Sequence, residues 1–184
     1  PLFSSSFPGI FDYQINILHT DSYIYTKDEI ALANDNLNYI FVENPYNFNL
    51  GYTRNLYKYL SLSVNILFVD CDIPLDEKYI DIMVKQAEEY DIIKPYDKIL
   101  INLTKEEKIE YLKKPFVPNR KAEKIYSITG GISLIKKSII DSLGGYEEIN
   151  TYGYEDRFLD VMILYKNYKI KKNDFKLVHL WHPI

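Results

Sequence analysis

Two carboxylates, Asp70 and Asp72, stand one residue apart at the end of the apolar run in ILFVDCDIP. Along an extended chain the side chains of residues i and i+2 point the same way, so both acids are expected to face one side and Cys71 the other. Neighbouring carboxylates repel each other unless a cation lies between them. Such oxygen ligands suit Mg²⁺ or Mn²⁺, which proteins commonly hold with one or two carboxylates and substrate phosphates. The pair predicts a metal–diphosphate site, and the alternative is a solvated acidic turn.

A sheet must position these acids, and the rest of the chain supplies its elements. Apolar spacing and turn residues predict helices over residues 27–33, 52–62, 75–90, 106–112, 136–143 and 155–165, and strands over 14–18, 39–42, 66–69, 92–93 and 175–180. Residues 116–124 carry several charges and no apolar period, which predicts a mobile loop that orders over a bound donor. Strands alternating with helices indicate an α/β/α sandwich with a mostly parallel sheet, which binds ligands beyond the carboxyl ends of its strands.

Composition narrows the class of protein. The 184 residues suffice for one core, and residues 1–184 are interpreted as a single domain. A net charge of −4 without a basic stripe argues against nucleic acid as the partner. The single Cys excludes an internal disulfide and favours a reducing compartment, so we expect a cytoplasmic location. No apolar run approaches the roughly 20 residues that span a bilayer, so no transmembrane segment is expected.

The residues that precede the acid pair resemble a known family. The stretch NPYNFNLGYTRNLYKYLSLSVNILFVDCDIPL is similar to the nucleotide-sugar region of family 2 glycosyltransferases with the GT-A fold. The matching positions are Asn47, Gly51, Arg54, Asn55, Asp70 and Asp72. The resemblance implies that Arg54, Asn55 and Asp70 bind the donor and that Asp72 ligates the metal. The forked donors of Arg54 suit phosphate or base, and a role as a surface salt-bridge partner is the alternative.

A second resemblance covers TGGISLIKKSIIDSLGGYEEINTYGYEDRFLDVMI, which is similar to the C-terminal segment of beta-1,4-galactosyltransferases and bacterial chondroitin-type polymerases. It implies a donor sugar over Gly130 and Gly131, a second match at Gly144, Gly145 and Tyr146, acceptor binding by Tyr152, Gly153 and Glu155, and catalysis by Asp156 with Glu155. Glycine lets the backbone approach a ligand closely, and an acid at a helix N-terminus is stabilised as an anion that can accept a proton. For both acids, helix capping is the alternative.

Two of the three His residues follow in KLVHLWHPI. Their distance from the Glu-Asp motif resembles that of the metal-binding His in these families, so His179, with His182 as second choice, is expected to join Asp72 on the metal. A structural role is the alternative. Asp21 lies where the family often has an acid at the uracil, which implies a donor contact.

The resemblance runs from residue 14 to residue 184 and departs from the pattern in two places. Relatives begin with a strand and a helix before the segment that matches residues 14–22, so this first pair is expected to be lacking or replaced. Tyr152 and Arg157 stand where relatives often have Trp and an acid, which leaves the acceptor open.

The function implied is a Mn²⁺- or Mg²⁺-dependent inverting glycosyltransferase that moves Gal, GalNAc or a similar sugar from a UDP-sugar donor to a saccharide acceptor. Two alternatives stay open. One is a non-catalytic nucleotide-sugar or glycan-binding module of the same descent. The other is a nucleotidyltransferase that uses the Asp pair, for which the sequence shows no basic, Gly-rich triphosphate loop.

Overall fold

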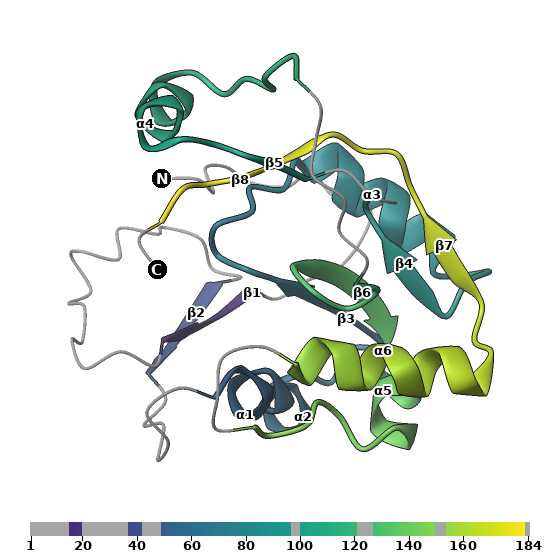
Figure 1. Cartoon of the computed structure of the whole chain (residues 1–184). Coiled ribbons are helices and arrows are strands. Elements are labelled where there is room, and N and C mark those ends of the chain that lie inside the picture. Colours follow the sequence, from purple (N-terminus) through teal and green to yellow (C-terminus); the bar gives the residue numbers. More distant parts are fainter. Residues whose placement is uncertain are drawn as a thin grey trace.

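The computed structural model describes residues 15–19, 37–41, 49–96, 100–120, 127–149 and 154–182 (Figure 1). The strands are β1 Ile15–His19, β2 Leu37–Phe41, β3 Asn65–Val69, β4 Ile92–Lys94, β5 Leu100–Asn102, β6 Ile132–Lys136, β7 Ile170–Lys172 and β8 Leu177–His179. The helices are α1 Leu50–Asn55, α2 Tyr57–Leu60, α3 Glu77–Gln86, α4 Lys105–Lys113, α5 Lys137–Ser142 and α6 Glu155–Lys166. No helix within these ranges is long and apolar enough to cross a membrane. The helix predicted over 27–33 falls outside them.

The largest sheet has the strand order β3-β6-β4-β7. Strand β6 runs antiparallel to β3 and β4, whereas β4 and β7 are parallel, as are the pairs β1·β2 and β5·β8. The expected α/β fold with a mostly parallel arrangement is confirmed. Because β6 runs against its neighbours, its first residue lies at the edge where β3 and β4 end. At this one edge of the sheet, β3 and β4 therefore end and β6 begins.

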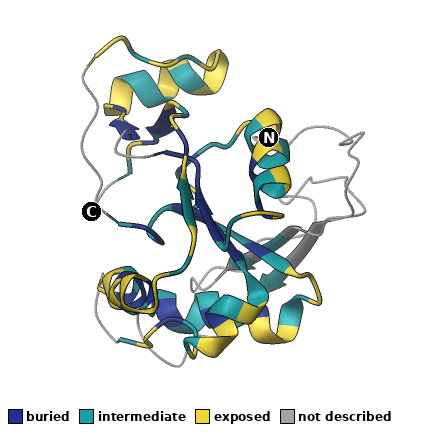
Figure 2. Cartoon of the chain, turned by 90° about the vertical axis from the view of Figure 1, so that its right-hand side faces the viewer, coloured by how far each residue is buried: buried dark blue, intermediate teal, exposed yellow. Residues whose placement is uncertain are grey.

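Buried apolar side chains cover both faces of this sheet. Successive residues of a strand point to opposite faces, so Ile92 packs with Leu159 and Ile163 of α6, whereas Ile93 packs with Met83 of α3. The strands are buried between helices whose outer sides are exposed, as the α/β/α sandwich requires (Figure 2). The smaller β5·β8 pair packs its own apolar cluster against α4.

The structure corrects three sequence predictions. The helix expected over 52–62 is divided at Leu56 into α1 and α2. Strands β5, β6 and β7 were not predicted; β6 is a short run buried on both faces, which periodicity cannot distinguish from a helix. The extended conformation expected through Asp72 ends at Val69, because the Ile73 N–H donates to the Asp70 carbonyl at 3.1 Å in a turn. The carboxylates of Asp70 and Asp72 therefore meet different partners.

Part of the predicted loop over 116–124 is described. Arg120 donates to both oxygens of Glu107, at 2.7 and 2.8 Å, which ties residue 120 to α4. Residues 121–124 lie outside the described ranges, so the mobility of this segment stays a prediction.

Candidate active site

Several element ends meet at the edge of the main sheet. Asp70 follows β3, Lys94 ends β4, and Gly131 precedes β6, where its carbonyl accepts from the Asp70 N–H at 2.9 Å. Helix α6 begins beside them with Glu155 and Asp156 in its first turn. The cleft between these elements has a volume of about 380 Å³ and is lined by Leu50, Arg54, Asp70, Gly130, Gly131, Tyr154, Glu155, Asp156 and Arg157.

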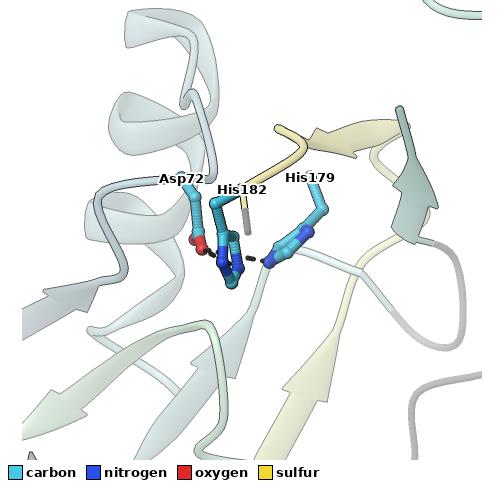
Figure 3. Close-up of side chains that lie close together, drawn as sticks. All are labelled: Asp72, His179 and His182. Carbon is cyan, nitrogen blue, oxygen red and sulfur yellow. Dashed lines mark ion pairs between the residues drawn. The ribbon is translucent and has the colours of Figure 1, made fainter. Parts of the chain in front are cut away.

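A cluster of Asp72, His179 and His182 lies where the end of β8 meets the turn after β3 (Figure 3). The Nε2 atoms of His179 and His182 lie 3.1 and 3.2 Å from the same Asp72 oxygen, Oδ2. The Leu180 N–H donates to the Asp72 carbonyl at 2.7 Å and fixes the two segments together. The fold thus brings together, across more than half of the chain, the three residues that the sequence named as metal ligands.

The chemistry of this cluster fits a divalent cation. The second Asp72 oxygen, Oδ1, is buried without a hydrogen-bond partner among the described residues, which native proteins seldom tolerate unless an ion or water is bound. Two imidazoles and a carboxylate suit transition metals such as Mn²⁺. Burial acts to raise the pKa of Asp72, but hydrogen bonding from His179 and the charges of both His residues hold that pKa below its ordinary value. The carboxylate is therefore ready to ligate at neutral pH.

Arg54 connects the donor region to the start of α6. Its Nη2 donates to Asp70 at 2.8 Å, and its Nη1 donates to Glu155 at 3.0 Å. The Arg54 and Glu155 side chains are only 10% and 7% exposed, so this is a largely desolvated pair rather than a surface one. The alternative for Arg54 was a surface salt bridge, whereas the structure places Arg54 in a largely buried ion pair, and its donor role stays a prediction.

Asn55 links α1 to the loop after α5. Its Nδ2 donates to the Tyr146 carbonyl at 2.8 Å and its Oδ1 accepts from the Tyr146 N–H at 2.8 Å. Asn55 is not among the described residues that line the cleft, and its predicted donor contact stays untested. Four further residues named from the sequence lie outside the described ranges: Asp21, Asn47, Tyr152 and Gly153.

Gly130 and Gly131 form a floor that tolerates no side chain. A Cβ at Gly130 would collide with Asp156 Oδ2 and lie 2.9 Å from Ser127 Oγ. Gly131 has a φ of +75°, and a Cβ there would lie 2.7 Å from the Tyr96 hydroxyl. The Asp156 carboxylate therefore lies directly against the Gly130 backbone. The Gly130-Gly131 and Glu155-Asp156 motifs, both from the second resemblance, thus meet in the fold.

Asp160, which the sequence analysis did not single out, builds the turn before these glycines. It accepts from Ser127 Oγ at 2.9 Å, and at 2.8 Å from the Ile128 N–H, the Thr129 N–H and Thr129 Oγ1. Asp160 stands four residues after Asp156, which puts both acids on one side of α6. This spacing was the sequence feature that could have identified Asp160. Through it, α6 holds the glycine turn in place.

Lys94 was missed as well. Its side chain is buried, its Nζ donates to the Gly130 carbonyl and lies 4.5 Å from the centre of the Tyr96 ring, and the Tyr96 hydroxyl donates to the same carbonyl at 3.2 Å. No carboxylate in the described part of the chain lies within ion-pair distance of it. Burial lowers the pKa of Lys94 to about 8, although Asp160, Asp156 and Asp70 act to raise it. The sequence feature that could have identified Lys94 is its position directly after the apolar Ile92 and Ile93, at the end of a strand.

Comparisons with known proteins agree with this geometry at the level of the fold. No protein-family model and no curated protein sequence matches the chain. Among solved structures, it is similar to the mannosyltransferase PcManGT from Pyrobaculum calidifontis in complex with GDP-Man and Mn²⁺, with a TM-score of 0.56 and 13% identity over 91% of the chain. The fold is GT-A-like. The chain spans about half of that structure, 47% of its length.

A second structure, HddC from Yersinia pseudotuberculosis, matches with a TM-score of 0.50 and 17% identity over 89% of the chain and 70% of its own length. At these identities the two structures establish the shared fold alone.

Proposed function

We propose that the chain is a metal-dependent inverting glycosyltransferase that uses a nucleotide-sugar donor, most simply a UDP-sugar, and a saccharide acceptor. The observation that carries this proposal is the convergence of Asp72 with His179 and His182, two residues along the chain from Asp70, which lines a cleft with Gly130, Gly131 and the first acids of α6. The similarity to a structure that holds GDP-Man and Mn²⁺ supports it.

Asp72, His179 and His182 would hold the cation, which when bound supplies a Lewis acid that offsets the charge of the departing diphosphate. Gly130 and Gly131 let the donor sugar approach the backbone. Arg54 fixes Asp70 and Glu155 relative to each other, so that the donor and acceptor sides of the cleft keep their spacing.

Asp156 is the proposed base. As the acceptor hydroxyl oxygen forms its bond to the anomeric carbon, the bond from that carbon to the diphosphate oxygen breaks, and the hydroxyl proton passes to the Asp156 carboxylate. The nucleoside diphosphate leaves with the electron pair of the broken bond. Attack from the face opposite the leaving group inverts the anomeric centre.

A donor screen tests the proposal directly. We expect one of UDP-Glc, UDP-Gal, UDP-GlcNAc, UDP-GalNAc or GDP-Man to release its nucleoside diphosphate in the presence of Mn²⁺, and release to stop in EDTA. Calorimetric binding of a donor without any release, even with an acceptor pool present, would instead favour a non-catalytic binding module. Neither binding nor release with any donor would remove the nucleotide-sugar assignment.

The Lys94→Met variant is expected to be more stable than the wild type at pH 7. Lowering the pKa of a buried Lys from about 10.4 to about 8 corresponds to a cost of about 3 kcal/mol for keeping its charge in the fold. Met keeps the volume, and the Gly130 carbonyl still accepts from the Tyr96 hydroxyl and, at 3.0 Å, from the Ile132 N–H. Because the unfolded chain binds more protons in the window between these two pKa values, this cost fades as the pH rises through it, and the advantage of the variant shrinks. Urea unfolding at pH 7 and pH 10 measures both effects.

The Lys94→Met variant should also bind the donor more weakly, because it removes an ammonium that lies under a cleft lined by three acids. We expect UDP affinity to fall by about tenfold, the size of roughly 1.4 kcal/mol. Lys85→Met, the same change at an exposed position of α3, is the matched control and should alter neither quantity. Unchanged UDP affinity in Lys94→Met would show that the lysine has no part in the donor site.

A further inference from the structure

The two sides of helix α6 differ in charge as well as in burial. All three acids of the helix face the protein: Glu155 and Asp160 are buried, and Asp156 lines the cleft. The apolar Leu159 and Ile163 complete this inward side within the core. The outward side of α6 is therefore free of acids.

Apolar side chains form a continuous stripe along that outward side. Tyr154, which precedes the helix, is 63% exposed, and the remaining members are Phe158 at 54%, Val161 at 65%, Leu164 at 63% and Tyr165 at 81%. Steps of three and four residues place them on one face of a helix. Figure 2 shows the corresponding exposed outer sides of the helices. A contiguous exposed apolar patch of this kind marks an interaction surface more often than scattered single residues do.

From residue 154 to residue 172, all of which the structure describes, every exposed charged residue is a cation. Arg157 flanks its beginning, and Lys166, Lys169 and Lys172 are exposed at and beyond its end. This concentration contrasts with the net charge of −4 of the whole chain. Helix α4 offers the comparison: its exposed Ile109 and Leu112 alternate with acids such as Glu106 and Glu110, as on an ordinary solvated face.

We infer that the outward face of α6, from Tyr154 to Tyr165 with its flanking cations, docks on an anionic lipid surface. The apolar stripe enters the boundary between headgroups and acyl chains, while Arg157 and the lysines contact lipid phosphates. An apolar face whose exposed charged neighbours over residues 154–172 are all cations complements such a surface, whereas a protein partner of mixed charge leaves that asymmetry without a counterpart.

The position of this face bears on the acceptor. Tyr154 and Arg157 line the cleft as well as the stripe, so the cleft opens at the docked surface. Resting on the proposed function, this arrangement selects an acceptor that is held at a membrane, as a saccharide attached to a lipid is. The docking itself does not depend on the reaction.

Vesicle sedimentation of the 184-residue chain tests the docking. We expect it to sediment with phosphatidylcholine vesicles that contain about 30% phosphatidylglycerol, to bind phosphatidylcholine alone at least tenfold more weakly, and to be released as salt shortens the Debye length. Leu164→Asp should reduce the partition coefficient by about tenfold or more, because a carboxylate on the apolar face opposes both insertion and the lipid charge. Leu112→Asp, the same change at a similarly exposed site of α4, should leave it unchanged.

Three results would overturn the inference. They are absence of binding to the anionic vesicles, equal loss in Leu164→Asp and Leu112→Asp, or a self-associated chain that Leu164→Asp converts to a monomer in sedimentation velocity, which would make the face an interface between copies. Circular dichroism of both variants excludes misfolding as the cause. Nucleotide release measured without vesicles tests the proposed reaction separately, so failure of one does not imply failure of the other.

Discussion

Asp72→Ala is expected to abolish Mn²⁺-dependent UDP binding while the fold remains intact. The Asp72 carboxylate is the atom group toward which both His179 and His182 point, so its removal leaves two imidazoles without the anionic ligand of the cluster. The backbone hydrogen bond from Leu180 to the Asp72 carbonyl survives the substitution. Even partners outside the first coordination shell are worth 10- to 100-fold in metal affinity, so we expect a loss of more than about 100-fold.

Two measurements separate the metal from the nucleotide. Electron paramagnetic resonance of Mn²⁺ reports the ion directly, and calorimetric titration of UDP with and without Mn²⁺ reports the linked affinity. Asp76→Ala, four residues along and exposed at the start of α3, is the control for removing an acid nearby. If Asp72→Ala keeps the Mn²⁺-dependent gain in UDP affinity, the metal assignment of the cluster fails.

The sequence was sufficient where one element carried the information. The apolar run before Asp70 predicted β3, the helical spacing after Asp76 predicted α3, and the acids of α6 were placed in its first turn. Local patterns failed where the partner lay far along the chain. β6 is buried on both faces by α3 and α6, so its sequence shows neither a period of two nor helical spacing.

In the candidate site, too, local sequence patterns identified individual residues but not the long-range contacts between them. Asp72 and the two His residues were named from motif positions, but their meeting depends on the pairing of β8 with β5 and on a turn that the extended interpretation of residues 70–72 missed. Lys94 and Asp160 act through the Gly130 turn, from β4 and α6, and only the assembled fold reveals contacts of that kind. Long-range contacts of buried polar groups are thus the part that the sequence does not report.

Asp156→Asn is expected to lower turnover by about 10²- to 10⁴-fold with nearly unchanged UDP affinity. Asn keeps the size of the side chain and can still accept from the Arg157 N–H, as Asp156 does at 2.8 Å, but its amide does not take up the acceptor proton. The position supports this role, because Asp156 lies against Gly130 in the cleft. The other two described acids that line the cleft, Asp70 and Glu155, both pair with Arg54.

Among the described acids that line the cleft, Asp156 is thus the one whose carboxylate is not engaged by Arg54. Glu155→Gln should act differently. It removes a charge from the pair with Arg54, so it should mainly weaken acceptor binding and raise the acceptor KM. Asp174→Asn, the same change as in Asp156→Asn at an exposed position away from the cleft, is the matched control and should keep full turnover.

Steady-state transfer to a cognate acceptor, once one is found, measures these differences, and NMR of the product gives its anomeric configuration. An inverting reaction needs a base on the face opposite the diphosphate, within hydrogen-bond reach of the attacking hydroxyl. Loss of turnover in Asp156→Asn with unchanged UDP affinity, together with an inverted product, would match that requirement. Near-full transfer by Asp156→Asn would remove the base assignment, and a product that retains the donor configuration would require a mechanism in which this carboxylate does not deprotonate the acceptor for direct attack.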